Sequence, residues 1–323
     1  MQLKPIMLFG LPRSGTTWLG KVFDSHPNTL YFHEPDSFGN LDGMPLFPEV
    51  SEAEQYRELL LDFVAKLQKS SSIRITGKLP QFPKAYRSMV GFLLRKYFLL
   101  GGKALSRVTK SEINVPRLIN KGYTGEGWIV WKSIESLGRL GVIVRLLPDS
   151  HGIHILRHPC GFVSSVQRGE SQRLLGGEVQ ASEDYGIYEA LLQTNEARKF
   201  ALTLKLLKDM HPVERLAWRW VLYNDKALSD CQKLNSCTAV RYEDLCAQPV
   251  IEYKKLFEAA GLTWSGQSED FIKASIDGGG GYYSVFRDPL EAARSWERQL
   301  AASDVDRILS VTRRSDAGKM YDG

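Results

Sequence analysis

The chain has 323 residues, of which 43% are hydrophobic and 24% are charged, as is ordinary for a globular protein with one or two α/β domains. Its net charge of +5 suits anionic ligands and does not indicate nucleic-acid binding. No apolar run is long enough for a membrane-spanning helix, and no signal peptide precedes the first strand, so we expect a cytoplasmic protein. The four cysteines lack metal-ligand spacing and are expected to be reduced, mostly buried thiols.

The first predicted unit is a buried strand, a turn and a helix. Residues 6–9 are apolar, residues 10–15 form a glycine-containing turn, and a helix is expected from Thr16 to Ser25. This arrangement directs free backbone N–H groups and the positive helix end at one point, which suits a phosphate-like oxyanion. Arg13 adds a cation, and Thr16 and Thr17 add hydroxyls. We predict an anion-binding loop; the alternative is an ordinary strand–helix connection.

The spacing of Gly10 and Gly15 also matches the Walker A loop of nucleotide kinases. Thr16, however, stands where that loop has its lysine. Without the lysine, a Walker A loop loses its main contact to the β- and γ-phosphates. The missing lysine therefore favours another class of phosphate-binding loop.

A second strand is predicted at residues 29–32, with His33-Glu34-Pro35 at its end, where open α/β sheets place their ligands. Ser51 and Glu54 predict a capping box before an apolar helical face, and residues 72–76 could be a further strand. Residues 83–107 are both apolar and basic. A core helix with a solvated basic side is favoured there, and a surface segment touching a membrane or a lipid-like acceptor is the alternative.

Strands and helices alternate through the rest of the chain. Strands are predicted at 128–132, 152–156 and 238–241, and helices at 213–231, 249–261, 289–300 and 303–311. The fold class is thus α/β: three layers, α/β/α, with a mainly parallel sheet. We expect one domain over 1–323, with an acceptor-binding or lid insertion around 80–125.

Several polar residues follow predicted strands and should meet at the carboxyl edge of the sheet. They are Gly10 to Gly15, His33-Glu34, Lys132-Ser133, Arg157 and Tyr242. Arg157 and Ser165, eight residues further on, could hold one phosphate from two sides, or could be an ion-pair partner and an exposed helix residue. Trp18 and Tyr242 could face a nucleotide base or be core aromatics.

The run Arg13-Ser14-Gly15-Thr16-Thr17-Trp18 resembles the 5′-phosphosulfate loop of sulfotransferases that use 3′-phosphoadenosine 5′-phosphosulfate (PAPS). Arg157 with Ser165 resembles the 3′-phosphate element of that family. Tyr242-Glu243-Asp244-Leu245 resembles its element near the adenine. Ser284 falls where related enzymes have a late PAPS-contacting loop.

The resemblance implies in-line transfer of a sulfuryl group from PAPS to an acceptor hydroxyl or amine, without a metal. The product of PAPS would be 3′-phosphoadenosine 5′-phosphate (PAP). Arg13 and the loop amides would stabilise the charge on the leaving phosphate. The family takes its base from a histidine in a Lys-X-His element, which Lys132-Ser133-Ile134 lacks, or from a glutamate near the end of the second strand.

Glu34 occupies that glutamate position and is the predicted base. His33 is the runner-up, and its side chain should point to the other face if the strand stays extended. Lys132 could stabilise the bridging oxygen or form a structural ion pair. The acceptor could be a small molecule, a carbohydrate or a lipid, bound by residues 37–50, 80–125 and 170–190. A P-loop kinase and a non-catalytic nucleotide-binding protein are the alternative functions.

Overall fold

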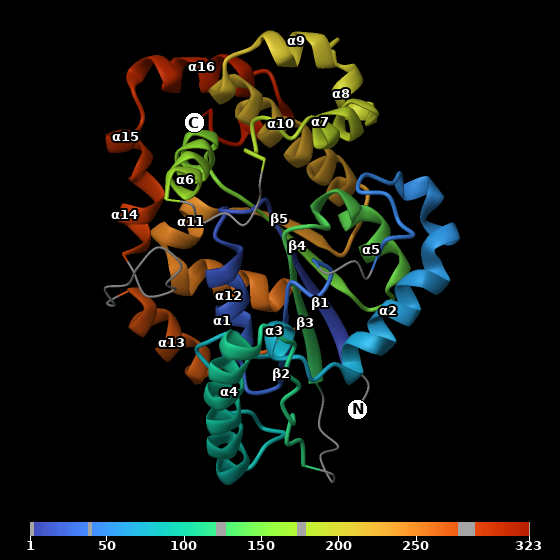
Figure 1. Cartoon of the computed structure of the whole chain (residues 1–323), viewed down its shortest axis with the longest axis vertical. Coiled ribbons are helices and arrows are strands. Elements are labelled where there is room, and N and C mark those ends of the chain that lie inside the picture. Colours follow the sequence, from blue (N-terminus) through green and yellow to red (C-terminus); the bar gives the residue numbers. More distant parts are fainter. Residues whose placement is uncertain (1–2, 38–40, 121–126, 173–178, 277–287, 323) are drawn as a thin grey trace.

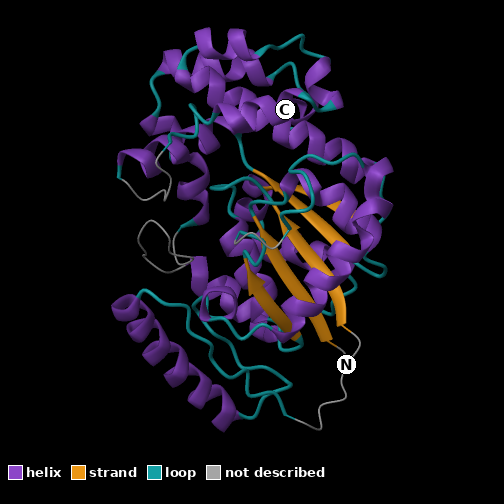
Figure 2. Cartoon of the chain, turned by 45° about the vertical axis from the view of Figure 1, so that its right-hand side comes forward, coloured by secondary structure: helices purple, strands orange, loops and turns teal. Residues whose placement is uncertain are grey.

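The computed structural model describes residues 3–37, 41–120, 127–172, 179–276 and 288–322. Five parallel strands form one sheet in the order β2-β3-β1-β4-β5. The strands are β1 (Leu3–Phe9), β2 (Thr29–His33), β3 (Gly127–Ser133), β4 (His151–Leu156) and β5 (Cys237–Arg241). Figure 2 shows the twisted sheet between layers of helix. The predicted α/β class is confirmed.

Two hydrophobic cores, one on each face of the sheet, follow from alternation along the central strand β1. Met7 and Phe9 pack into one core, whereas Ile6 and Leu8 pack into the other. Successive side chains of a strand point to opposite faces, so a continuous apolar run suits a strand covered on both sides.

Helices cover both faces and extend the domain beyond the sheet (Figure 1). In chain order they are α1 (Thr16–Ser25), the 3-10 helix η1 (Val50–Tyr56), α2 (Arg57–Lys69), α3 (Ile73–Thr76), α4 (Met89–Thr109), the 3-10 helix η2 (Leu137–Arg139), α5 (Leu140–Leu146), α6 (Pro159–Ser171), α7 (Tyr185–Leu192), α8 (Asn195–Arg198), α9 (Leu204–Asp209), α10 (Pro212–Gln232), α11 (Tyr242–Ala247), α12 (Pro249–Ala259), α13 (Gly266–Ile276), α14 (Pro289–Arg294), α15 (Trp296–Gln299), α16 (Ala302–Thr312) and α17 (Asp316–Lys319). Helices α2, α5, α6, α10 and α16 contribute to the first core, and α1, α11, α12 and α13 to the second.

The strand register brings the predicted site segments to one edge of the sheet. Phe9, at the end of β1, pairs with Ser133, and His33, at the end of β2, pairs with Lys132. Leu156, at the end of β4, pairs with Arg241. Because all strands are parallel, the segments that follow these residues leave the sheet on the same side.

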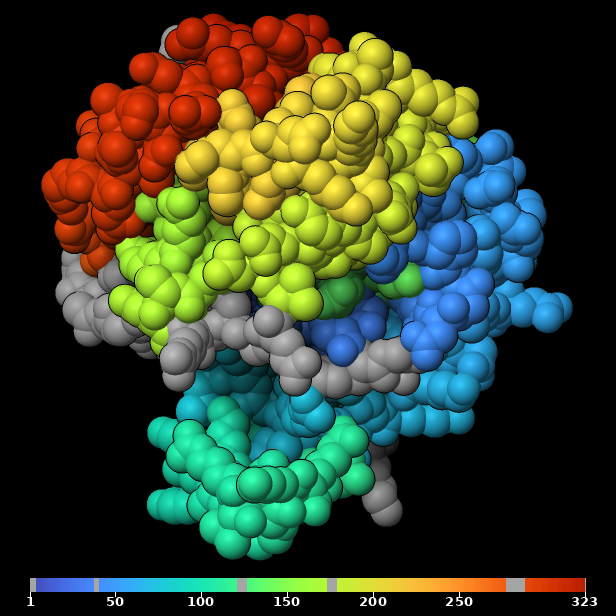
Figure 3. Space-filling view, turned by 45° about the horizontal axis from the view of Figure 1, so that its top comes forward, coloured from blue at the N-terminus to red at the C-terminus, as the bar shows by residue number. Residues whose placement is uncertain are grey.

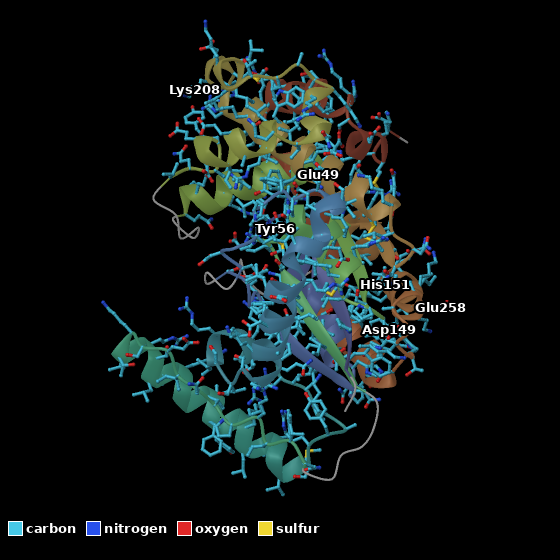
Figure 4. All side chains as sticks on the ribbon, turned by 90° about the vertical axis from the view of Figure 1, so that its right-hand side faces the viewer. Glu49, Tyr56, Asp149, His151, Lys208 and Glu258 are labelled. Atoms are coloured by element: carbon cyan, nitrogen blue, oxygen red, sulfur yellow. A yellow bond between two sulfur atoms is a disulfide. The ribbon has the colours of Figure 1, made fainter. Side chains whose placement is uncertain are left out.

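Three local predictions were wrong. Residues 72–76 form the short helix α3 rather than a strand, apart from a single bridge between Ser72 and Asn114. The capping box before α2 uses Glu49 and Glu52, not Ser51 and Glu54; Glu49 and Tyr56 mark η1 in Figure 4. Residues 289–300 divide into α14 and α15.

The cysteine prediction also needs correction. Cys231, at the end of α10, and Cys237, at the start of β5, form a disulfide across a separation of six residues. Cys160 and Cys246 are buried free thiols, as predicted. A disulfide is unusual in a cytosolic protein, so cysteine content no longer favours a cytoplasmic location.

The favoured interpretation of residues 83–107 as a core helix was wrong. Helix α4 is continuous through three glycines, and among its residues only Arg95 and Leu99 are buried. It projects from the body of the protein at the lower end of Figure 3. None of the helices in the described part of the chain is long and apolar enough to cross a membrane.

Candidate active site

The turn between β1 and α1 is a tight loop whose shape depends on Gly15. Gly15 has a φ of 88°, in the left-handed region, and Arg13 has a φ of 75°. A Cβ atom on Gly15 would lie 2.4 Å from the ring of Tyr242. Glycine is therefore required here both by backbone conformation and by the ring packed beneath the loop.

The N-terminus of α1 carries no compensating negative charge from its own sequence. Its N-cap residue, Gly15, has no side chain to cap the helix, and the first turn has no acidic residue. The first N–H groups of a helix have no partner within the helix, and the helix dipole makes this end positive. The end of α1 thus fits the oxyanion site that the sequence predicts.

The structure brings Arg13, Arg157 and Ser165 together around the loop. The Arg13 Nε donates a hydrogen bond of 3.1 Å to the Ser165 hydroxyl, in helix α6. The Arg157 guanidinium donates to the Arg13 carbonyl at 2.9 Å and to the Ala292 carbonyl at 2.6 Å. The two arginines that the sequence assigned to separate phosphate groups are therefore neighbours, and Arg157 also joins the loop to α14.

Trp18 and Tyr242 both lie in the core beside the loop. Their rings pack edge to face, with centroids 6.5 Å apart, and the Arg157 guanidinium lies 5.1 Å above the Tyr242 ring. The Trp18 indole donates to the Ser275 hydroxyl at 3.0 Å. Tyr242 is 1% exposed, so in this structure its ring supports Gly15 from below.

Glu34 and Lys132 form an ion pair at the edge of the sheet. The Glu34 backbone N–H donates to the Lys132 carbonyl at 2.8 Å, which continues the β2–β3 ladder. Glu34 then takes a positive φ of 49°, so the extended chain ends there. His33 Nε2 consequently lies 3.7 Å from Glu34 Oε1. The opposite-face orientation of His33 was expected only for an extended chain, and that condition is not met because extension stops at Glu34.

Burial and nearby cations determine the protonation of this cluster. Burial, followed by the charges of Lys132 and Lys78, holds the pKa of His33 far below its usual range, so its imidazole is neutral at physiological pH. Burial also lowers the pKa of Lys132, against the opposing effect of the Glu34 carboxylate. Among the described residues, both partners of Glu34 reach Oε1, which leaves Oε2 for another donor.

Sequence reasoning missed two buried polar residues beside this cluster. The Tyr31 hydroxyl lies 2.9 Å from His33 Nδ1. The buried Asp36 carboxylate accepts hydrogen bonds from the Trp131 indole at 3.2 Å and from the hydroxyls of Ser133 and Ser136. Tyr31 lies two residues before His33, on the same strand face, and Asp36 lies two residues after Glu34; those spacings were the available signal.

The structure thus places Arg13, Ser14, Gly15, Thr16, Thr17, Trp18, Arg157, Ser165 and Tyr242 around one loop, and His33, Glu34 and Lys132 at the ends of β2 and β3. Ser284, the late-loop candidate, lies outside the described residues. Strand β3, which carries Lys132, lies between β1, which leads into the loop, and β2, which leads to Glu34. Two steps across a sheet span about 10 Å, so one bound molecule could reach from the loop to Glu34.

The structure is a parallel α/β sheet with a glycine turn between its first strand and an uncapped helix N-terminus, an arrangement that suits phosphate-like anions. The sequence profile of the Sulfotransferase family matches residues 5–198, more than half of the chain. This protein belongs to the sulfotransferase family. No curated protein sequence matches it.

Solved sulfotransferase structures resemble this chain at low sequence identity. The sulfotransferase domain of the curacin biosynthetic pathway is 16% identical, covers 96% of this chain and 97% of that chain, and has a TM-score of 0.45. The sulfotransferase domain of a Synechococcus olefin synthase is 13% identical, with coverages of 100% and 96% and a TM-score of 0.47. A mouse sulfotransferase complexed with PAP is 12% identical, with coverages of 99% and 88% and a TM-score of 0.42. The family assignment rests on the sequence profile.

Proposed function

We propose that this protein transfers a sulfuryl group from PAPS to a hydroxyl or amine of a small molecule, carbohydrate or lipid, with Glu34 as the general base. The observation that carries the proposal is the pairing of two sites on one sheet edge. The loop with Arg13 and the uncapped N-terminus of α1 lie on one side of β3. The Glu34 carboxylate, paired with Lys132, lies on the other side.

In the proposed reaction the acceptor oxygen or nitrogen forms a bond to sulfur as the bond from sulfur to the bridging phosphate oxygen breaks. The electron pair of the broken bond stays on that oxygen, where Arg13 and the loop amides oppose the growing charge. The acceptor proton passes to Glu34. Lys132 orients that carboxylate through its ion pair, and Lys132 could also face the bridging oxygen.

His33 is a weak candidate for the base. A proton acceptor works best when its pKa lies near the working pH. The pKa of His33 is held far below that range by burial and by Lys132. Within this cluster His33 serves instead as a neutral neighbour of the Glu34 carboxylate, oriented by Tyr31.

Thermal unfolding with added nucleotide tests the donor. A ligand at a hundred times its Kd stabilises a protein by about 2.7 kcal/mol, so PAP should raise the melting temperature by several degrees. ATP with magnesium should leave the melting temperature unchanged, because Thr16 replaces the Walker lysine. Stabilisation by magnesium ATP and not by PAP would reject the proposal in favour of a P-loop kinase.

A matched pair of variants locates the effect in the loop. Arg13→Gln removes the cation beside Ser165 and should weaken PAP binding by roughly tenfold or more, since charge-assisted contacts to phosphate are among the stronger hydrogen bonds. Arg145→Gln removes an exposed arginine in α5 and should leave the PAP-induced shift intact. Equal shifts in the two variants would place PAP away from this loop.

A further inference from the structure

Helix α4 turns an apolar face away from the protein. Val90, Leu93, Tyr97 and Val108 are exposed at 67%, 47%, 70% and 83%, and their spacing of three, four and eleven residues puts them on one side of the helix. The buried Leu99 lies on the opposite side. An exposed large apolar patch marks a binding surface more often than does a scattered apolar residue.

The anchoring of α4 fixes this orientation. Leu99 packs with Ile73 and Val115 in a separate small hydrophobic cluster. On the same side, the Arg95 guanidinium donates to the Thr76 carbonyl at 3.2 Å and to the Pro116 carbonyl at 2.7 Å. Rotating the helix to bury its apolar face would break all of these contacts, so the face is presented to solvent by the fold itself.

Cations line one flank of the apolar face. Lys96 and Arg107 are exposed, and neither has an ion-pair partner among the described residues. Lys103 is half-buried and lies toward Lys21 and Lys78 of the protein body. The sequence between Asp62 and Glu112 contains eleven lysines and arginines and not one carboxylate. The charge of this region therefore complements an anionic surface.

We propose that α4 is a membrane-binding helix that lies in the plane of an anionic lipid bilayer. Its apolar face would enter the interface, and Lys96 and Arg107 would lie at the level of the lipid phosphates. A helix of 21 residues is about 32 Å long, and α4 lies at the outer edge of the molecule in Figure 4, so its outer side can lie flat on a surface.

Two other surfaces could cover the apolar face of α4, namely a second copy of this chain or the chain's own site, and both fit less well than a membrane. A second copy of this chain packed through α4 would bring like charges together, because α4 contains four cations and no acidic residue to pair with them. A lid closing over the chain's own site would need its apolar face turned toward the sheet edge, and that side of α4 instead holds Arg95 and Leu99.

Vesicle flotation of the full chain tests this proposal. The protein should float with phosphatidylcholine vesicles that contain phosphatidylglycerol, and much less with phosphatidylcholine alone. Leu93→Asp combined with Tyr97→Asp should weaken binding by roughly tenfold or more, because two anchors are lost and two like charges face the lipid phosphates. Lys96→Gln combined with Arg107→Gln should lower binding to the mixed vesicles by about tenfold or more.

Ile251→Asp is the matched control. It places one aspartate on a similarly exposed apolar residue outside α4, 51% exposed in α12, and should float like the wild type. No flotation of the wild type, equal flotation of the α4 variants, or a dimer in solution that Leu93→Asp with Tyr97→Asp abolishes would overturn the proposal. Membrane binding and PAP binding are tested separately. The α4 variants should keep the PAP-induced thermal shift, so failure of one test does not contradict the other proposal.

Discussion

Glu34→Gln should lower turnover by about 100- to 10,000-fold while PAP binding stays close to that of the wild type. The amide keeps the size of the side chain and an oxygen for Lys132, but it cannot accept the acceptor's proton. PAP contacts are assigned to the loop after β1, on the other side of β3, so donor binding should survive. The measurement is kcat with labelled PAPS, alongside the PAP-induced thermal shift.

His33→Gln is the control for this prediction. It replaces the runner-up base while leaving the ion pair of Glu34 and Lys132 in place. We expect its turnover to fall by less than about tenfold, since His33 is a poor proton acceptor in this environment. Unchanged turnover in Glu34→Gln together with a large loss in His33→Gln would move the base to the imidazole. Unchanged turnover in both would remove the base from this cluster.

Gly15→Ala should destabilise the protein by roughly 2–5 kcal/mol and weaken PAP binding. Part of the cost is backbone strain, because a left-handed conformation costs a residue with a Cβ about 1–2 kcal/mol. The rest arises from overpacking against Tyr242, a ring with 1% exposure that has no room to retreat; overpacking typically costs about 1–3 kcal/mol. Denaturant unfolding measures the change in free energy.

Gly261→Ala separates the two contributions. Gly261 has a φ of 67°, and a Cβ atom there would meet no heavy atom within 4 Å. Its substitution should cost only the backbone strain, about 1–2 kcal/mol, with no effect on PAP. If the two alanine substitutions lowered the free energy of unfolding by the same amount, the packing of Tyr242 against Gly15 would not contribute to the loss.

Much of the fold and the grouping of the candidate site could be predicted because they depend on local patterns. Apolar runs of β1, β3 and β4 are buried on both faces, and a parallel sheet brings the residues after its strands to one edge. This alone was enough to place Glu34 near Lys132. The contact between Arg13 and Ser165 joins residues 152 positions apart. From the sequence we could predict only that the segments containing them follow strands of the same sheet.

The features that could not be predicted from the sequence depend on local changes of backbone conformation and on tertiary contacts. The positive φ of Glu34 ends the extended chain on which the expected orientation of His33 depended, and no pattern of side chains indicates a single left-handed residue. The apolar content of α4 predicted burial, although the fold anchors the opposite side of that helix. Cys231 and Cys237 pair because β5 begins beside the end of α10, which spacing alone does not reveal.

Transfer of labelled sulfur tests the central claim most directly. A cell extract would be incubated with PAPS labelled at sulfur and either the wild-type protein or Glu34→Gln, with γ-labelled ATP in parallel. We predict that the wild type moves the label from PAPS onto an organic acceptor identified by mass spectrometry, and that Glu34→Gln binds PAP but forms little product. Label transferred from ATP and not from PAPS would contradict the account.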